Sequence, residues 1–265
     1  MTKKVYTVFF LIMFVLMLPI STLAAENEDD SEDAAEVPDH VFDISQENTY
    51  PNATEEQEVV EPSDLTQALM EDLDIPIENP ELIKMLNETS IDPSPISFGY
   101  RGMVYIGRWP LHYESEETNT NWEYQSINTN ELNNIGGDSD KEMQYEQQEK
   151  QEVKGALTTK IANSEDVKKM ILLQAKDKMD LPLAYTTVVG QNTKKANAYN
   201  VPVKKHAKLK TYAPAVNERG QVTFGEVYFQ LKGNKKKLVV QNVTKQGIGA
   251  WLPVQDHVSF SFQLK

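Results

Sequence analysis

Two kinds of hydrophobic pattern divide this chain. An early stretch repeats its apolar residues at the spacing of an amphipathic helix, whereas the long C-terminal part alternates apolar and polar residues as strands do. The first pattern predicts a helical pair over residues 62–87, and the second predicts a strand-rich body over residues 95–265. We therefore expect one domain over residues 61–265, of the α+β class: an antiparallel β-sheet rich body with about three short helices.

The helical pair has recognisable start signals. Ser63 stands before Asp64 and is expected to cap the first helix, and Asn79 is expected to start the second, with Pro80 in its first turn. Helical spacing also predicts the residues that face inward: Leu65, Leu69 and Leu73 in the first helix, and Leu82, Ile83 and Leu86 in the second.

A third helix is expected after Asn163, which we predict to cap it. The segment just before it is rich in Gln and Glu but too sparse in apolar residues for a helical face, so we interpret it as two paired strands, 143–149 and 151–161. The predicted inner face of the helix consists of Val167, Met170, Ile171, Gln174 and Ala175.

Residues 95–130 concentrate aromatic side chains and form the stretch on which later strands could pack. They contain two of the three tryptophans, four of the eleven tyrosines and two of the three arginines. Alternation predicts a strand up to Tyr100 and separate strands over residues 103–106 and 122–127, with a break at residues 107–110. Near the C-terminus, Gly225 interrupts a strong strand and indicates a bulge.

The N-terminus predicts export. Residues 1–25 combine a short basic start, an apolar run and small residues before a cleavage point after Ala25, as a secretory signal peptide does. An uncleaved anchor is the alternative, although the apolar run is short for a membrane span. Residues 26–60 are expected to be an acidic, largely disordered leader, within which Phe42 and Ile44 could dock as an extended arm.

The amino-acid composition limits the kinds of chemistry that this protein could perform. None of the 265 residues is cysteine, which excludes disulfides, thiol nucleophiles and cysteine-ligated metals. Residues 26–165 carry a net charge of −27, and residues 166–265 carry +11. Two interpretations follow: the acidic half pairs with the basic half, or the basic half meets an anionic polymer or lipid. The first needs no partner and is preferred.

No catalytic, metal-binding or cofactor-binding motif is present in the sequence, and we expect no cofactor. One functional hypothesis gathers Arg108 and His112 with a nearby carboxylate into an acid/base or anion site, beside the aromatic Trp109. The competing interpretation is a surface loop with Trp109 as a core anchor. Glu123 and Glu226 lie among aromatic residues on predicted strands and are the candidate pair for a sugar-cleaving enzyme.

Basic residues give the candidate binding set. Four lysines cluster after residue 203, and lysines at the tip of a predicted hairpin, residues 235–237, add to them. They could bind wall polymer or anionic lipid, or simply keep exposed strands from pairing with other chains. The full candidate set is Lys204, Lys205, Lys208, Lys210, Arg101, Arg108, Trp109 and His112.

Several runs of sequence resemble one protein family. They are VPDHV at residues 37–41, NTYPN at 48–52, SFGYRG at 97–102 and GRWPL at 107–111. They are similar to the YfkD-like family, a group of uncharacterised exported proteins of Bacillus and its relatives. The resemblance covers most of the chain after the signal segment. It implies an origin and a compartment, and it supplies no activity and no site residues.

We expect an exported, non-enzymatic protein, secreted through the Sec pathway and associated with the cell envelope. Its partner would be an anionic wall polymer, a membrane surface or another protein, and nucleic acid is not expected outside the cell. The alternative is an unrecognised hydrolase that acts on cell-wall material. The basic C-terminal half without a catalytic motif favours the binding function.

Overall fold

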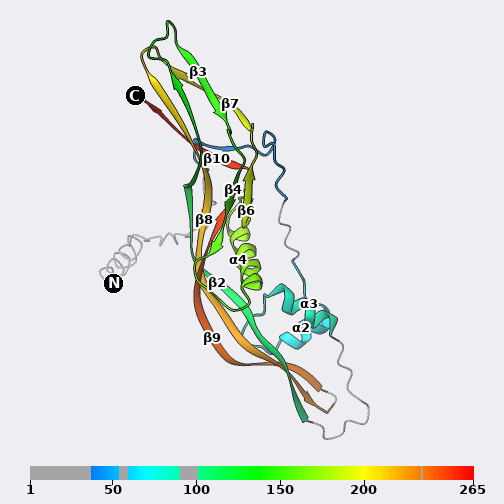
Figure 1. Cartoon of the computed structure of the whole chain (residues 1–265). Coiled ribbons are helices and arrows are strands. Elements are labelled where there is room, and N and C mark those ends of the chain that lie inside the picture. The colour runs from blue at the N-terminus through cyan, green and yellow to red at the C-terminus, as the bar shows by residue number, and fades with distance from the viewer. Residues whose placement is uncertain (1–36, 54–58, 90–100, 234) are drawn as a thin grey trace, which may run out of the picture. The chain divides into compact units, whose positions relative to one another are not determined.

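The computed structural model describes residues 37–53, 59–89, 101–233 and 235–265, which belong to one compact unit. The predicted signal segment of residues 1–25 and the predicted strand that ends at Tyr100 lie outside these residues. Two long strands, β2 (Arg101–Asn133) and β8 (His206–Lys232), dominate the fold (Figure 1). They have 33 and 27 residues, whereas strands of globular proteins usually have 3–10.

The main sheet is antiparallel and is built on β8. One edge of β8 pairs with β2 from end to end. The other edge pairs first with β10 (His257–Leu264) and then with β9 (Lys235–Pro253). β1 (Val41–Asp43) extends the sheet beyond β10, and β5 (Ala156–Leu157) extends it beyond β9. The expectation of antiparallel sheets with about three helices is confirmed in this coarse form.

The separate strands predicted over 103–106 and 122–127 are wrong, because both belong to the continuous strand β2. The predicted break at residues 107–110 is instead a pair of register shifts, one on each side of Arg108. A β-bulge accommodates one extra residue in a strand, which bends the strand without ending it. Gly107 has a φ of 147°, a conformation that favours glycine, and it supplies the first of these irregularities.

The predicted bulge at Gly225 is confirmed, since the β8–β9 register shifts between Phe224 and Glu226. The shift changes which positions of β8 are buried. Val222 and Phe224 are buried before it, and Val227 and Phe229 are buried after it. The bulge therefore keeps apolar side chains on one face of the sheet although the even–odd pattern of the sequence changes.

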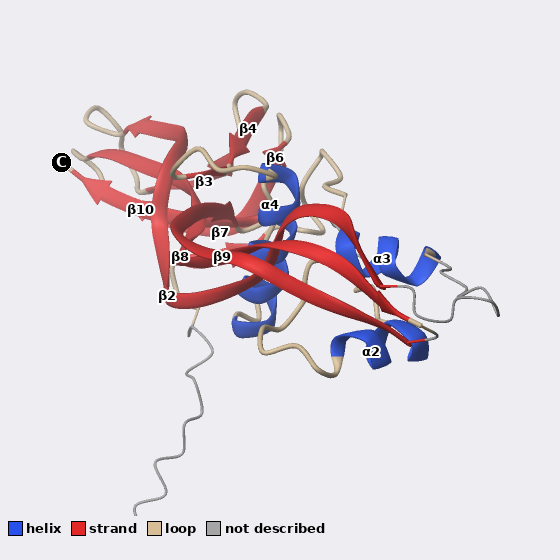
Figure 2. Cartoon of the chain, turned by 90° about the horizontal axis from the view of Figure 1, so that it is seen from below, coloured by secondary structure: helices blue, strands red, loops and turns tan. Residues whose placement is uncertain are grey.

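Two small sheets pack beside the main one (Figure 2): β3 (Lys141–Glu146) pairs with β7 (Lys194–Val201), and β4 (Gln151–Lys154) pairs with β6 (Thr186–Val189). Strands in the region 143–161 were expected, but the prediction that they pair with each other is wrong. Each finds a distant partner instead. A core cluster explains the choice, because Tyr145 and Val153 are buried there together with Leu209 and Phe260.

The three helices are α2 (Asp64–Met70), α3 (Pro80–Glu88) and α4 (Ser164–Lys178). The predicted starts of α2 and α3 are confirmed: the Ser63 hydroxyl accepts from the Thr66 amide, and the Asn79 side chain accepts from the amides of Glu81 and Leu82. The predicted start of α4 is confirmed, because Asn163 occupies its N-cap position, but it caps the helix by position alone. This residue has a left-handed backbone and makes no side-chain capping bond.

Most predicted inner positions of α3 and α4 are confirmed, whereas Gln174 of α4 is only partly buried and Leu65 of α2 is exposed. Leu82, Ile83 and Leu86 are buried in α3, and Val167, Met170, Ile171 and Ala175 are buried in α4. Leu65 in α2 was expected to face inward but is 71% exposed, and its neighbour Thr66 is buried instead. The short helix rotates so that Thr66 and Ser63 share a hydrogen bond at the helix start.

One face of the long sheet is covered in three successive places. Side chains of β3 and β7 cover the end near Leu209, α4 covers the middle around Val222, and α3 with residues around α2 covers the end near Phe229 (Figure 1). No helix in the described part of the chain is long and apolar enough to cross a membrane.

The packed region begins before residue 61, within the segment that was expected to be leader. β1 pairs with β10, and Ile44 is completely buried. The side-chain amides of Asn48 and Asn52 both donate to the carboxylate of Asp256 and to the carbonyl of Val188. The ring of Phe42 in β1 also contacts that of Phe260, with the two centroids 5.1 Å apart. The extended arm inferred from the apolar residues is therefore present and includes a regular strand.

Candidate functional site

The four clustered lysines lie where β7 leads into β8. Lys204 and Lys205 form the turn, which is tied down by backbone hydrogen bonds to Asn134. Lys208 and Lys210 follow on β8, on the face opposite buried Leu209. Lys208 forms an ion pair with Glu131, and this hydrogen bond lowers the pKa of the Glu131 carboxyl. Lys204, Lys205 and Lys210 have no ion-pair partner among the residues that the structure describes.

Arg101 belongs to a different part of the sheet. It pairs in register with Lys232, the last residue of β8, whereas Lys210 lies near the start of the same strand. The 22 residues between Lys210 and Lys232 correspond to roughly 70 Å of strand. The structure therefore divides the predicted binding set between two ends of β8 and does not bring it together as one site.

Arg108, Trp109 and His112 lie in the first half of β2 and do not converge. The Arg108 guanidinium donates to the carbonyl of Asn242 at 3.2 Å and to the hydroxyl of Thr244 at 2.5 Å. Trp109 packs, partly buried, against the core that includes α3. These contacts fit the structural interpretation of the segment, with Trp109 as an anchor and Arg108 joining two strands.

His112 does find a carboxylate, but not one of its neighbours in sequence. Its Nδ1 atom lies 2.8 Å from the Glu78 carboxylate, which belongs to the loop before α3. Glu78 also borders a shallow hollow of about 260 Å³, together with Gln174 and Asp177 of α4. The acid/base hypothesis thus keeps His112 and gains Glu78, while Arg108 is not part of the arrangement.

Glu123 and Glu226 are too far apart to act on one glycosidic bond. Glu226 lies opposite Arg108, and Glu123 lies in the bulge next to Asn121, which is opposite Ala215. Eleven residues of β8 separate the two positions, or about 35 Å of strand. Paired glycosidase carboxylates stand within about 10 Å of each other. This pair is therefore no catalytic site.

The charge asymmetry is partly neutralised inside the molecule. Seven long-range ion pairs among the described residues join an acid before residue 166 to a cation after it, as the preferred interpretation expected. The side chains are mostly half-exposed, so water screens each pair and each adds little to the stability of the fold. The pairs are Lys169–Glu81, Lys194–Glu146, Lys195–Glu47, His206–Glu131, Lys208–Glu131, Arg219–Glu117 and Lys245–Glu114.

The cations at the far end of β8 form the second basic group. We call this part of the sheet the ribbon end: residues 101–105 of β2, 228–232 of β8 and 235–239 of β9. Val227 and Phe229 face the helices here, so the alternate residues form the opposite face. Cross-strand register arranges that face in three rows: Arg101 with Lys232 and Lys235; Met103 with Gln230 and Lys237; and Tyr105 with Tyr228 and Val239.

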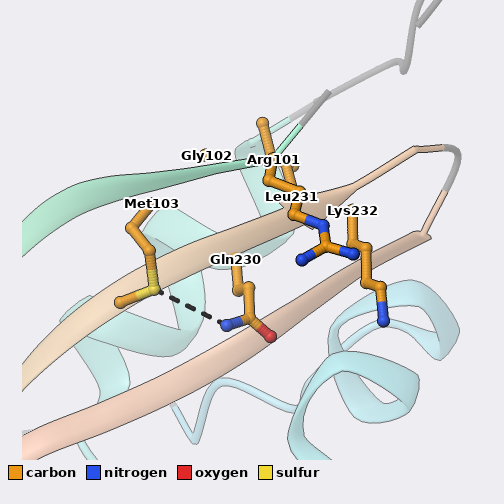
Figure 3. A pocket seen from close by; sticks show the side chains of 6 residues that line it. All are labelled: Arg101, Gly102, Met103, Gln230, Leu231 and Lys232. Atoms are coloured by element: carbon orange, nitrogen blue, oxygen red, sulfur yellow. Dashed lines mark hydrogen bonds between the residues drawn. The ribbon is translucent and has the colours of Figure 1, made fainter. Parts of the chain in front are cut away.

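The ribbon end also has a hollow of about 420 Å³ (Figure 3). Arg101, Lys232 and Gln230 line this hollow, and the Gln230 amide donates to the Met103 sulfur at 3.7 Å. Arg101 and the lysines at 235–237 were noticed separately in the sequence. Only the strand register reveals that they share one surface, and no spacing rule in the sequence supplies that register.

Metal binding gains no support from the geometry. The described residues contain no group of three or more His, Asp or Glu side chains that could hold a metal ion. Two features therefore characterise the molecule: a long antiparallel sheet covered on one face, and basic groups at two ends of its central strand. These define a strand-rich protein with basic surface patches.

Comparison with known proteins gives its family. The family model described as YfkD-like protein matches residues 38–265. A relative from Bacillus subtilis (strain 168), Uncharacterized protein YfkD, is 55% identical over 228 residues, which cover 86% of each chain. The chain belongs to the YfkD-like family, which confirms the resemblance inferred from its sequence runs.

Among solved structures, the crystal structure of Lamprey immune protein is similar over 62% of this chain and 53% of that chain. The sequence identity is 7% and the TM-score is 0.24. A likeness this low carries no inference about fold or function.

Proposed function

We propose that this protein is exported and binds an anionic component of the bacterial envelope, without catalysing a reaction. The observation that carries the proposal is the distribution of cations left after the long-range ion pairs have formed. Lys204, Lys205 and Lys210 at one end of β8 have no ion-pair partner among the described residues. Arg101 and Lys232 at the other end likewise lack one within the described part of the chain.

Electrostatics explains why such groups favour an anionic ligand. Like charges directly opposite each other on neighbouring strands destabilise a sheet, and Arg101 and Lys232 are in that position. A bound polyanion would remove the repulsion and gain the attraction of several cations at once. Because the cations are exposed, salt would screen this attraction strongly, over a Debye length of about 10 Å at 0.1 M.

The experiment is co-sedimentation of the protein that begins at residue 26 with purified cell walls and, separately, with anionic lipid vesicles. We expect binding to at least one of them at low salt and a steep fall in binding as salt rises. A variant that changes Lys204, Lys205, Lys210, Arg101 and Lys232 to Glu should bind neither. Absence of binding by the unaltered protein at low salt would overturn the proposal.

A hydrolase that acts on wall material is the second candidate, and one contact favours it. His112 lies 2.8 Å from Glu78, as in an acid/base pair, and Glu78 borders a hollow. The test is release of soluble fragments from purified walls by the protein and by its His112→Ala variant. Fragments released by the protein and not by the variant would favour this candidate over pure binding.

A further inference from the structure

We propose that the ribbon end is a docking surface for an anionic phospholipid membrane. This inference rests on the proposed envelope binding and adds to it the ligand and the place where the ligand binds. The surface is the face of the ribbon end opposite the helices, and its three rows pass from cations to apolar and aromatic residues within a few strand positions.

Charge is the first argument. The row of Arg101, Lys232 and Lys235 brings three cations side by side, and Lys237 adds a fourth in the next row. The three rows contain no carboxylate. The nearest acid on this face is Glu226, which already accepts hydrogen bonds from the Tyr228 hydroxyl and the Asn242 amide at 2.8 and 2.7 Å. The cations are thus available to lipid phosphates.

The exposed apolar side chains are the second argument. Met103 is 44% exposed and Tyr105 is 56% exposed, and the Tyr105 and Tyr228 rings lie 5.1 Å apart. Tyrosine suits the boundary between lipid head groups and acyl chains, because its ring is apolar and its hydroxyl is polar. A wall polymer of phosphates and hydroxyls would use the cations but not these side chains. The combination therefore favours a lipid surface.

The other end of β8 also exposes apolar side chains, among them Val203 and Ile135, but its charges differ. There, Glu131 pairs with Lys208 and His206, and Asp140 accepts a hydrogen bond from the backbone amide of Val203. Carboxylates thus stand among the cations, and a membrane would be repelled by them. This difference makes Lys204 and Lys205 a matched control for Arg101 and Lys232, since all four are exposed cations without an ion-pair partner in the described chain.

The test measures binding of the protein that begins at residue 26 to vesicles of equal phosphatidylglycerol and phosphatidylcholine. Each cation near an anionic membrane contributes a factor of about five to the binding constant. The double variant Arg101→Glu with Lys232→Glu should therefore bind at least about 30-fold more weakly. The control, Lys204→Glu with Lys205→Glu, carries the same change in charge and should retain binding within about threefold.

Two further variants report on contact and on folding. Tyr105→Trp should show fluorescence quenching by brominated phosphatidylglycerol if the ribbon end enters the interface. The neutral double variant Arg101→Gln with Lys232→Gln avoids new acidic groups and should still bind less than the unaltered protein. Circular dichroism of each variant verifies that the loss reflects the surface and not unfolding.

The outcomes separate the two proposals. Binding to walls but not to vesicles would overturn membrane docking and leave the envelope-binding proposal standing. Binding to neither would overturn both. Vesicle binding that is equal in the ribbon-end variants and the unaltered protein, or that is lost in the Lys204 and Lys205 control instead, would overturn the assignment of the ribbon end.

Discussion

At the scale of single residues, Glu218 is the most unusual side chain of the core. It is completely buried in β8, and its carboxylate accepts hydrogen bonds from the hydroxyls of Tyr113 and Thr118 at 3.1 and 2.6 Å. No cation among the described residues forms an ion pair with Glu218. Burial of a carboxylate costs free energy unless the group is hydrogen-bonded. The hydroxyls of Tyr113 and Thr118 therefore stabilise the buried Glu218 side chain.

Removal of one donor should therefore destabilise the fold. We expect Tyr113→Phe to lower the free energy of unfolding by about 1–3 kcal/mol, because Glu218 loses a hydrogen bond while the ring remains. Urea denaturation of the variant and the unaltered protein measures the difference. The double variant with Glu218→Gln should recover part of the loss, since it removes the buried charge. A fully stable Tyr113→Phe variant would contradict the role given to the hydroxyl.

Because of Tyr113, we also expect the folded protein to become less stable at alkaline pH. Burial, with the nearby Glu218 carboxylate, raises the pKa of Tyr113 well above its ordinary value of 10.0. The folded protein thus holds the hydroxyl neutral, whereas the unfolded chain can ionise it. The stabilising effect is complete below pH 10 and declines as pH rises above that value. Denaturation at pH 8 and pH 11 tests this, and Tyr113→Phe should weaken the dependence.

At the scale of elements, the sequence predicted most elements but few of their partners. The starts of α2 and α3 follow from Ser63 and Asn79, because capping is a local interaction. The partners of β3 and β4 depend on contacts with residues 32 to 60 positions away, which local alternation does not encode. For the same reason the sequence showed the ribbon end only as scattered cations: Arg101 and the lysines at 235–237 had been noted, but Lys232 between them had not.

The bulge at Gly225 gives a prediction at this scale. A Cβ atom added there would lie 2.5 Å from a methyl group of Val240 and 2.8 Å from one of Leu111, which is fully buried. Overpacking of this kind costs about 1–3 kcal/mol. We expect Gly225→Ala to lower the thermal midpoint, measured by circular dichroism. Gly247→Ala in β9 is the control, because an added Cβ there meets nothing within 4 Å. Equal midpoints for the two variants would contradict the close packing at the bulge.

At the scale of the whole molecule, the charge separation along the sequence predicted ion pairs between the two halves but could equally indicate an anionic partner. The acidic first half does pair with the basic second half, as in Lys169–Glu81 and Arg219–Glu117. Hydrogen bonding to Lys169 lowers the pKa of the Glu81 carboxyl. Yet the pairing is incomplete, and the cations without an ion-pair partner lie near the two ends of β8. The net charge of each half could not distinguish internal pairing from binding to an outside anion, because it does not say where the charged side chains lie in the fold.

The N-terminal arm allows a final prediction for the molecule as a whole. A chain that begins at residue 61 would lack β1, the fully buried Ile44, and the amides of Asn48 and Asn52 that donate to Asp256 and Val188. Loss of one buried isoleucine side chain alone costs about 2–5 kcal/mol. We therefore expect this chain to be at least about 4 kcal/mol less stable in urea than one that begins at residue 37. The variant Ile44→Ala in the longer chain should reproduce about half of the loss. If both chains unfold at the same urea concentration, the arm is not part of the folding unit, and the domain begins where the leader was first expected to end.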